Sequence, residues 1–201
     1  MQAVLDEYEH RAAEETTVIR ALADGEMARR RDEFLISVGP RTGTLLNILA
    51  KESKAQLIVE VGASYGYSTI WLADAARETG GRVLSLELSQ DKVKYGRERL
   101  ARAGLESYVE FRLGDARDSL ASLAGPFDFV LIDLWKDLYI PCFDLIYPRL
   151  RAGGFIAADN MLQPENTVAH ANAYREYVRT KPDLETVLLP VGSGVELTRR
   201  R

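Results

Sequence analysis

Short apolar runs alternate with stretches of helical periodicity between residues 56 and 159, and this alternation is the feature that most constrains the fold. The five runs read QLIVEV (56–61), RVLSLEL (82–88), YVEFRL (108–113), FDFVLID (127–133) and GGFIAAD (153–159). The segments between them predict helices from about residue 67, after residue 89, near 116–124 and over 143–150. Strands joined by helical crossovers form parallel sheets with helices on both faces. The pattern therefore predicts a doubly wound α/β fold.

Both ends of the chain add elements to this core. Apolar residues recur near the helical period in the first 25 residues, and RTGTLLNILAKES (41–53) predicts a second helix. Near the C-terminus, TVLLP and GVELTR are strand-like, and turn residues 191–193 join them as an antiparallel hairpin. We therefore expect one domain over residues 1–201 with a mostly parallel, seven-stranded sheet. Residues 1–53 would supply the extra N-terminal helices and residues 54–201 the α/β core.

Composition excludes several kinds of site. The single cysteine, Cys142, excludes an intrachain disulfide and a cysteine-clustered metal site, and two histidines, His10 and His170, are too few for a multi-histidine centre. No apolar run approaches the roughly 20 residues of a membrane span. The start of the chain lacks the pattern of a secretion signal, so we expect a cytoplasmic protein without a membrane partner. The net charge of −4 argues against an extended nucleic-acid surface.

Acidic residues follow the first three strands, at the sheet edge where ligands of such folds bind. Glu60 precedes a turn with Gly62 and Gly66, Glu87 ends the second strand, and Asp115 follows the third. The glycine spacing departs from the G-x-G-x-x-G pattern of dinucleotide-binding proteins. Each residue has a structural alternative, because tight turns need glycine, Glu87 suits a surface, and Asp115 suits a helix cap. Together the three acids favour a nucleoside-type ligand that donates hydrogen bonds from ribose and adenine.

Oxygen-bearing side chains also follow the fourth and fifth strands. Asp133 ends FDFVLID, and Asp159 and Asn160 end the next strand. Neighbouring strands lie about 5 Å apart, so the three side chains can converge, and an all-oxygen donor set suits Mg²⁺ or another hard divalent cation. An Asp-Asn turn without a metal is the alternative. Lys136 follows Asp133 by three residues and could act as a base, since a nearby cation favours a neutral lysine; a solvent-exposed loop lysine is the alternative.

The motifs EVGASYGYS, LEL, GDA, IDLWKDLY and ADN resemble those of the class I S-adenosylmethionine-dependent O-methyltransferases, in particular the metal-dependent, catechol O-methyltransferase-like family. The resemblance covers residues 34–196. It implies S-adenosylmethionine as cofactor, Mg²⁺ or another divalent cation, and a small catechol-type acceptor. It also implies that residues 1–53 carry the substrate-side loop and that residues 54–201 bind the cofactor.

The resemblance assigns roles to individual residues. Glu60 and Gly62 would line the cofactor, Ser68 and the Val38 region would hold its methionine carboxylate, Glu87 would bind the ribose, and Asp115 with Ala116 would flank the adenine. The implied cofactor set is Val38, Glu60, Gly62, Ser64, Tyr67, Ser68, Glu87, Leu88, Asp115, Ala116, Asp133 and Trp135. Ser64 departs from the family, in which many members carry a tyrosine at this position.

The resemblance also gives a metal, a base and an acceptor site. Asp133, Asp159 and Asn160 match the metal ligands, and Lys136 matches the catalytic base. The implied substrate-binding set is Phe34, Ile36, Trp135, Lys136, Asn160, Pro164 and Glu196. Catechol-specific members carry an acid at the position of Glu196, whereas relatives that act on phenylpropanoid thioesters often carry a small polar residue there. An outward-facing strand position is the alternative for Glu196.

Two other functions stay open. Some relatives methylate a hydroxylated tRNA base, which would require a basic surface track, and a nucleotide-binding module could keep the fold and lose catalysis. A nicotinamide dehydrogenase is disfavoured by the glycine spacing. The N-terminal helix could pack on its own domain or pair two subunits, so both a monomer and a homodimer are compatible with the sequence. For Asp137 we expect a cap of the helix that starts at LYIPCF.

Overall fold

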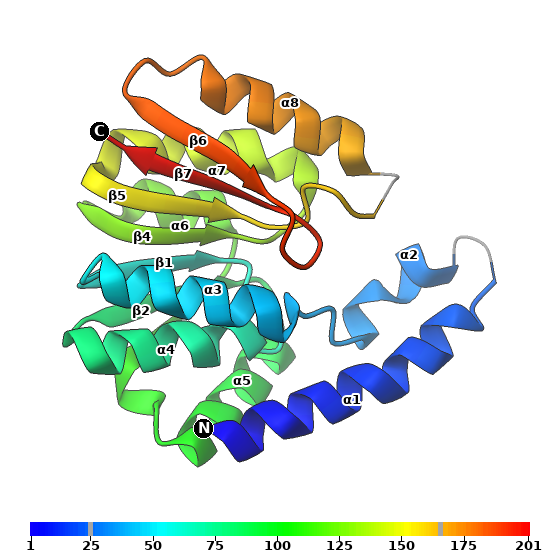
Figure 1. Ribbon diagram of the computed structural model, residues 1–201. Coiled ribbons are helices and arrows are strands. Elements are labelled where there is room, and N and C mark those ends of the chain that lie inside the picture. The colour runs from blue at the N-terminus through cyan, green and yellow to red at the C-terminus, as the bar shows by residue number, and fades with distance from the viewer. Residues whose placement is uncertain (24–25, 165–166) are drawn as a thin grey trace.

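A computed structural model describes residues 1–23, 26–164 and 167–201, which form one seven-stranded sheet between two layers of helices (Figure 1). The strands are β1 (Leu57–Val61), β2 (Arg82–Glu87), β3 (Val109–Leu113), β4 (Phe127–Ile132), β5 (Leu150–Ala158), β6 (Leu184–Leu189) and β7 (Val195–Arg200). Their order is β3-β2-β1-β4-β5-β7-β6, and β1 to β5 pair in parallel while β7 pairs antiparallel to both β5 and β6. The predicted fold class and the C-terminal hairpin are confirmed.

The helices cover the sheet in two sets that lie on opposite faces (Figure 1). One set comprises α3 (Gly39–Glu52), α4 (Tyr67–Thr79) and α5 (Gln90–Ala103), with α1 (Gln2–Arg20) packed outside it. The other set comprises α6 (Ala116–Ser122), α7 (Tyr139–Ile146) and α8 (Val168–Arg179). Successive residues of a strand point to opposite faces, so Ile58 packs with the first set and Val59 with the second.

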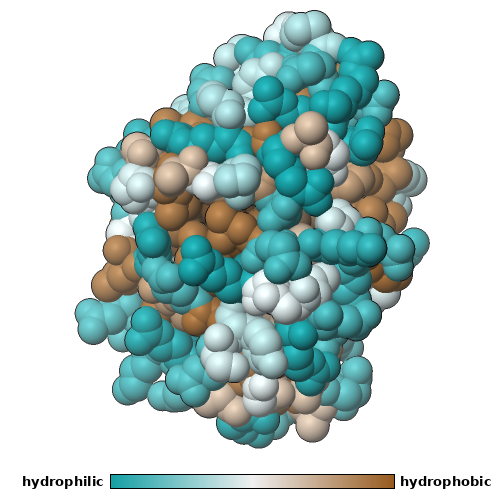
Figure 2. Space-filling model, turned by 90° about the vertical axis from the view of Figure 1, so that its left-hand side faces the viewer, coloured by the Kyte–Doolittle hydropathy of each residue, from teal (hydrophilic) through white to brown (hydrophobic). Residues whose placement is uncertain are grey.

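The N-terminal segment runs past the edge of the sheet at which the parallel strands end. The second half of α1 and the short α2 (Glu26–Arg30) extend beyond the core on that side, and residues 31–38 return to the start of α3 (Figure 1). The opposite edge, where the parallel strands begin, has a mainly hydrophilic surface with apolar side chains gathered near its middle (Figure 2). None of the helices in the described part of the chain combines the length and the apolar character that a membrane span requires.

Two local predictions need correction, and one helix was not predicted. The helix predicted over 143–150 begins at Tyr139 and ends at Ile146, because Pro148 follows in a 3-10 turn (Tyr147–Arg149) and β5 starts at Leu150. Asp137 is not the cap of α7, since it lies inside the 3-10 turn Lys136–Leu138 and the N-cap is Leu138. Helix α8 was not predicted, and it covers β7 and β6 on the second face (Figure 1).

Candidate active site

A cavity of about 320 Å³ opens at the carboxyl edge of the parallel strands. Residues that follow β1, β2, β3, β4 and β5 contribute to its wall, together with the returning segment 32–37. Of the residues predicted from the sequence, its wall includes Phe34, Ile36, Gly62, Ser64, Glu87, Leu88, Asp115, Ala116, Asp133, Trp135 and Asn160. The fold therefore brings most of the predicted cofactor, metal and acceptor residues to one place.

The turn after β1 approaches the end of β4 closely. Gly62 has φ +94°, and a Cβ atom there would lie 2.2 Å from the carbonyl oxygen of Asp133. Any other side chain at this position would push the turn away from the candidate metal residues, so the geometry requires glycine. Ser64 also has a positive φ, +48°, and its N–H donates to the Glu87 carboxylate at 2.7 Å.

Glu87 is held by backbone donors on both sides of the cavity. Besides the Ser64 N–H, its carboxylate accepts from the N–H groups of Leu88 at 3.0 Å and Ser89 at 2.9 Å. These bonds fix the carboxylate at the cavity wall. A carboxylate has about four acceptor positions, so one remains for a ribose hydroxyl.

Asp115 combines both roles that the sequence left open. It is the N-cap of α6, where its carboxylate accepts from the Arg117 N–H at 2.7 Å, and it also lines the cavity. The Arg117 guanidinium forms an ion pair with this carboxylate at 2.7 Å and lowers its pKa to about 2. The group therefore offers an ionised acceptor at neutral pH.

Four residues of the implied cofactor set do not line the cavity. Val38 and Tyr67 are buried in the first core layer, and the Tyr67 hydroxyl donates to Glu9 at 3.0 Å. Ser68 donates to Glu60 at 2.6 Å. These positions leave a direct contact between the four residues and a cofactor as a prediction.

For Glu60 the structure corrects the expected position of the side chain. Glu60 has no exposed surface, because the hydroxyls of Ser68, Thr69 and Ser85 enclose its carboxylate. Burial raises the pKa of this carboxyl above its ordinary value. Its side chain therefore supports β1, β2 and α4 beneath the turn and does not form the cavity wall.

The three candidate metal ligands meet at the ends of β4 and β5. The backbone N–H of Asp133 donates to Val61 O at 2.9 Å and that of Asp159 donates to Ile132 O at 3.1 Å, which continues the parallel pairing past the strands. Asn160 has φ +54° and donates from Nδ2 to Asp159 Oδ2 at 3.3 Å. Asp133 and Asn160 line the cavity, and Asp159 lies beside them with 1% of its surface exposed.

The surroundings of Asp159 test whether these residues could hold a cation. Its Oδ1 is buried and has no hydrogen-bond partner among the described residues. Burial, followed by the charge of Asp133, raises the pKa of this carboxyl to about 8. A buried oxygen without a partner and two mutually repelling carboxylates are what a hard cation would relieve, so the donor set fits one. The described residues hold no metal-type group of three or more His, Cys, Asp or Glu, so the candidate rests on two acids and one amide.

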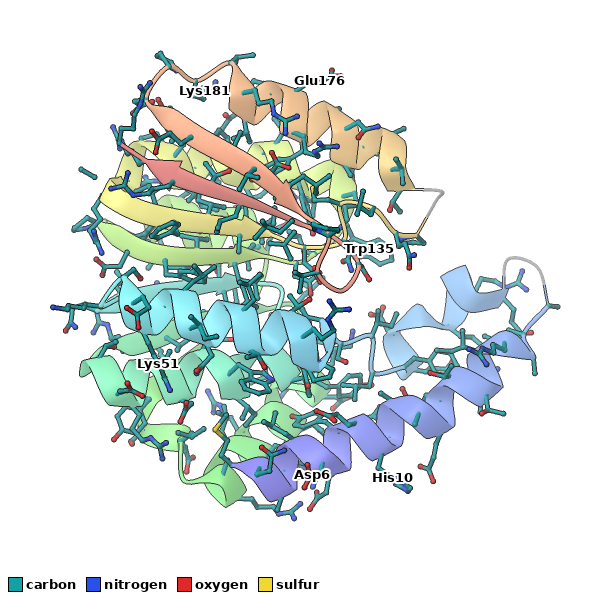
Figure 3. The ribbon with its side chains drawn as sticks, viewed as in Figure 1. Asp6, His10, Lys51, Trp135, Glu176 and Lys181 are labelled. Carbon is teal, nitrogen blue, oxygen red and sulfur yellow. The ribbon has the colours of Figure 1, made fainter. Side chains whose placement is uncertain are left out.

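Lys136 begins the 3-10 turn that follows β4, and Trp135 is the N-cap of that turn. The Lys136 ammonium contacts the Tyr139 hydroxyl, lies 4.0 Å from the centroid of that ring, and is 3.3 Å from Asn160 Oδ1. The Trp135 side chain is 51% exposed and stands at the cavity mouth (Figure 3). The turn therefore places a basic group next to the candidate metal ligands and an aromatic ring at the entrance.

The predicted acceptor residues divide into two groups. Phe34 and Ile36 line the cavity as predicted, whereas Pro164 is exposed and is not part of its wall. Glu196 is also absent from the wall. It is fully buried under α8, where it forms ion pairs with Arg175 at 3.0 Å and Arg179 at 2.8 Å.

This position corrects both interpretations of Glu196, the acceptor contact and the outward-facing strand residue. The residue lies on the face of β7 that α8 covers, and the two arginines, four residues apart on that helix, neutralise it. Glu196 therefore gives no support to a catechol acceptor.

Sequence reasoning missed four polar residues of the wall, one of which is Ser37. Asp32, Ser89 and Lys92 line the cavity, and the Lys92 ammonium is 2.6 Å from Asp32 Oδ1. Ser89 caps α5 and directly follows the LEL motif, which is a local signal for a strand-end position. Asp32 and Lys92 lie 60 residues apart, and nothing in their local sequence indicates that they meet.

Comparison with known proteins identifies the family. A family model described as O-methyltransferase matches residues 9–201. The chain is 39% identical to a catechol O-methyltransferase from Niastella koreensis over 132 residues, which are 64% of this chain and 59% of the relative. It is 30% identical to caffeoyl-CoA O-methyltransferase 2 from Populus trichocarpa over 196 residues, 87% of this chain and 79% of the relative.

A solved structure extends the similarity to the whole fold. The O-methyltransferase from Bacillus cereus, crystallised in complex with SAH, superposes with a TM-score of 0.77 at 28% identity and covers 99% of this chain and 91% of its own. A family match over nearly the whole length, together with this fold, leaves one assignment. The chain belongs to the O-methyltransferase family of S-adenosylmethionine-dependent enzymes.

Proposed function

We propose that this enzyme transfers the methyl group of S-adenosylmethionine to one hydroxyl of an aromatic vicinal diol, and that it requires Mg²⁺ or a similar divalent cation. The observation that carries the proposal is the buried Oδ1 of Asp159, which has no hydrogen-bond partner within residues 1–23, 26–164 and 167–201 and lies beside Asp133 and Asn160. A protein gains nothing from burying such an atom unless a ligand satisfies it.

Asp133, Asp159 and Asn160 are the residues that would hold the cation. When bound, a divalent cation would lower the pKa of a coordinated hydroxyl and fix the position of a chelating diol. The three side chains supply only oxygen donors, which favours a hard cation over zinc or copper. The close approach of Gly62 to the Asp133 carbonyl ties this group to the turn after β1.

Lys136 is the proposed base. Its ammonium nitrogen lies 3.3 Å from Asn160 Oδ1, so an acceptor hydroxyl held next to Asn160 comes within hydrogen-bond reach of it. In its neutral form Lys136 accepts the proton of that hydroxyl. The Tyr139 hydroxyl and ring fix the lysine in place.

The remaining wall residues orient the two substrates. Glu87 and Asp115 present carboxyl oxygens for the ribose and the adenine, and Leu88 and Ala116 add apolar surface to the cavity wall. Phe34, Ile36 and Trp135 form an apolar wall for an aromatic ring on the other side. The sulfonium methyl passes directly to the acceptor oxygen, and the protein contributes chiefly by holding the two reactants in line.

The size of the acceptor is the open part of the proposal. Relatives of this chain act on catechol and on caffeoyl-CoA by name, and the Glu196 correction removes the residue that favoured a small catechol. A small catechol stays the first candidate, because the relative named for catechol is 39% identical to this chain, and a phenylpropanoid thioester is the second, because the relative named for caffeoyl-CoA is 30% identical.

The test is a methyl-transfer assay with S-adenosylmethionine and a panel of 3,4-dihydroxybenzoate, caffeate, a catecholamine and caffeoyl-CoA, each with Mg²⁺ and with EDTA. We expect turnover of at least one diol, abolished by EDTA and restored by added Mg²⁺. Undiminished activity in EDTA would refute the cation. A preference for a hydroxylated tRNA, weakening steeply with salt, would refute the small acceptor, and tight cofactor binding without turnover of any diol or RNA would indicate a non-catalytic module.

A further inference from the structure

Tyr65 lies at the centre of the turn after β1, but its ring points away from the cavity. Its neighbour Ser64 lines the cavity, whereas Tyr65 does not. Ser64 and Gly66 on either side both have positive φ values, +48° and +92°. A left-handed conformation at a non-glycine residue costs on the order of 1 kcal/mol and persists only where neighbouring contacts hold it.

Helices α1 and α5 hold Tyr65 from behind. The Tyr8 hydroxyl donates to the Tyr65 carbonyl at 2.6 Å, and the Arg11 guanidinium lies 4.3 Å from the centroid of the Tyr65 ring. The Tyr95 ring packs against it edge to face at 5.4 Å. A cation over an aromatic face and a T-shaped pair each add stabilisation beyond area burial. The turn is thus clamped at both its backbone and its side chain.

The same tyrosine reaches the segment that forms the acceptor side of the cavity. The Tyr65 hydroxyl donates to the Asp32 carbonyl at 2.9 Å, and residues 32, 34, 36 and 37 all line the cavity. A second path leads from its ring through Arg11, which is 2.6 Å from Glu15, to the Leu35 N–H, which donates to Glu15 at 2.5 Å. These two paths between the turn and segment 32–37 start at the side chain of one residue, Tyr65.

We propose that Tyr65 is a positioning residue that couples the cofactor turn to the acceptor wall, so that binding of the cofactor orders segment 32–37 for the acceptor. The inference rests on the proposed function, since it takes the turn 62–66 as part of the cofactor site. A ligand that fixes the strained turn also fixes the Tyr65 hydroxyl, and with it the backbone of Asp32. Binding of the cofactor is then expected to raise the affinity for the acceptor.

The Lys92–Asp32 ion pair supports this arrangement without replacing it. Its 2.6 Å contact joins α5 to the same segment, but the Asp32 side chain is 80% exposed and such pairs contribute little. The hydroxyl bond to the Asp32 carbonyl acts on the backbone itself. Tyr65→Phe removes that bond and leaves the ring contacts in place.

The test is hydrogen exchange of the full chain, read in peptides covering residues 32–38, with and without S-adenosylhomocysteine. We expect S-adenosylhomocysteine to protect these peptides in the wild type and to protect them much less in Tyr65→Phe. With 3,4-dihydroxybenzoate as acceptor, KM is expected to rise about two- to twelvefold, the contribution of one neutral hydrogen bond, while kcat stays unchanged. Arg11→Met cuts the second path and should add to the loss of protection.

The matched control is Tyr177→Phe, which removes the 2.8 Å bond from a tyrosine hydroxyl to Asp144 on the other side of the sheet. It should leave both the protection and KM as in the wild type. Protection of 32–38 in Tyr65→Phe equal to that in the wild type, with S-adenosylhomocysteine still bound, would overturn the coupling alone. Failure of the wild type to bind S-adenosylhomocysteine would overturn the proposed function together with it.

Discussion

Glu60 in β1 and Asp159 after β5 are both buried acids near the same edge of the sheet, but their surroundings differ. Three hydroxyls, from Ser68, Thr69 and Ser85, donate to the Glu60 carboxylate. Asp159 has one weak partner, the Asn160 amide at 3.3 Å, and a buried oxygen with none among the described residues. Burial raises the pKa of both carboxyls, and Asp133 adds to the effect at Asp159.

The difference in hydrogen bonding indicates a structural role for Glu60 and a ligand-binding role for Asp159. Both oxygens of the Glu60 carboxylate accept hydrogen bonds from hydroxyls of the protein itself, and the residue stabilises the structure beneath the turn 62–66. Burial of Asp159 Oδ1 costs free energy that no hydrogen bond from the described residues offsets, which is expected where a ligand completes the site. We therefore expect two buried acids, in β1 and directly after β5, strands that β4 separates, to serve different purposes, and the predictions below test this difference.

The largest effect is expected for Lys136→Met, next to Asp159, and it is an effect on kcat. Loss of a general base typically lowers kcat by about 10²- to 10⁴-fold. The measurement is kcat for the best diol of the panel at saturating S-adenosylmethionine. Lys181→Met is the matched control, because the Lys181 ammonium lies 4.0 Å from the centroid of the Tyr177 ring, as Lys136 does from Tyr139, yet it sits far from the cavity (Figure 3). Equal kcat values in the two variants would remove Lys136 from the mechanism.

Asp159→Asn should follow. Even residues that only orient metal ligands change activity or metal affinity by about 10- to 100-fold, so a ligand itself should cost at least about 100-fold in kcat/KM. The Mg²⁺ concentration for half-maximal activity should also rise, which separates a ligand from a general structural defect. Asp6→Asn, on the outer surface of α1 (Figure 3), makes the same chemical change at an exposed position and should leave both quantities unaltered.

Glu60→Gln tests the structural role of the other buried acid. The amide offers one acceptor oxygen in place of two and adds donors that face hydroxyl groups, so we expect a loss of about 1–3 kcal/mol in the free energy of unfolding. Urea denaturation measures it, with the exposed Glu110→Gln as control. The Mg²⁺ dependence of the remaining activity should match that of the wild type. A shifted Mg²⁺ requirement would show that Glu60 belongs to the metal side, and the comparison with Asp159 would fail.

The sequence was sufficient for the features that depend on strand order along the chain. A site residue can be predicted where it closely follows an apolar run, because parallel pairing brings such positions to one edge of the sheet. Gly62, Glu87, Asp115, Asp133 and Asn160 all line the cavity at that edge. The resemblance to a known family added the identity of the chemistry, which no periodicity supplies.

The contacts that could not be predicted depend on which face of the sheet a side chain points to and on which helix covers that face. Glu196 alternates with its strand neighbours onto the α8 side, and α8 itself was not predicted, so Arg175 and Arg179 could not be assigned as its partners. Glu60 follows the same rule, since only the fold shows that three hydroxyls close over it. Pairs such as Asp32 and Lys92 join segments that are distant in the chain, and short-range patterns carry no information about them.

The smallest expected effect is a dependence of metal stabilisation on pH. The pKa of Asp159 is raised to about 8 in the absence of a cation, above the value of about 3.9 expected for an unfolded chain. Protonation of Asp159 therefore adds to the free energy of unfolding. This contribution is complete below about pH 4 and is lost as the pH rises through about 8. In EDTA the Tm should fall between about pH 5.5 and about pH 8.5, and the fall should be smaller in Asp159→Asn.

Mg²⁺ should reverse that loss, because it takes the place of the missing proton. We expect it to raise Tm by at least about 2–4 °C near pH 8.5, the shift that about 1 kcal/mol produces in a chain of this size, and by less near pH 5.5, where the cation competes with the proton. The raised pKa of Glu60 contributes a fall of the same sign that Mg²⁺ leaves untouched. Scanning fluorimetry of the wild type, Asp159→Asn and Glu60→Gln separates the two carboxylates, and equal Mg²⁺ shifts at both pH values would argue that the cation does not bind at Asp159.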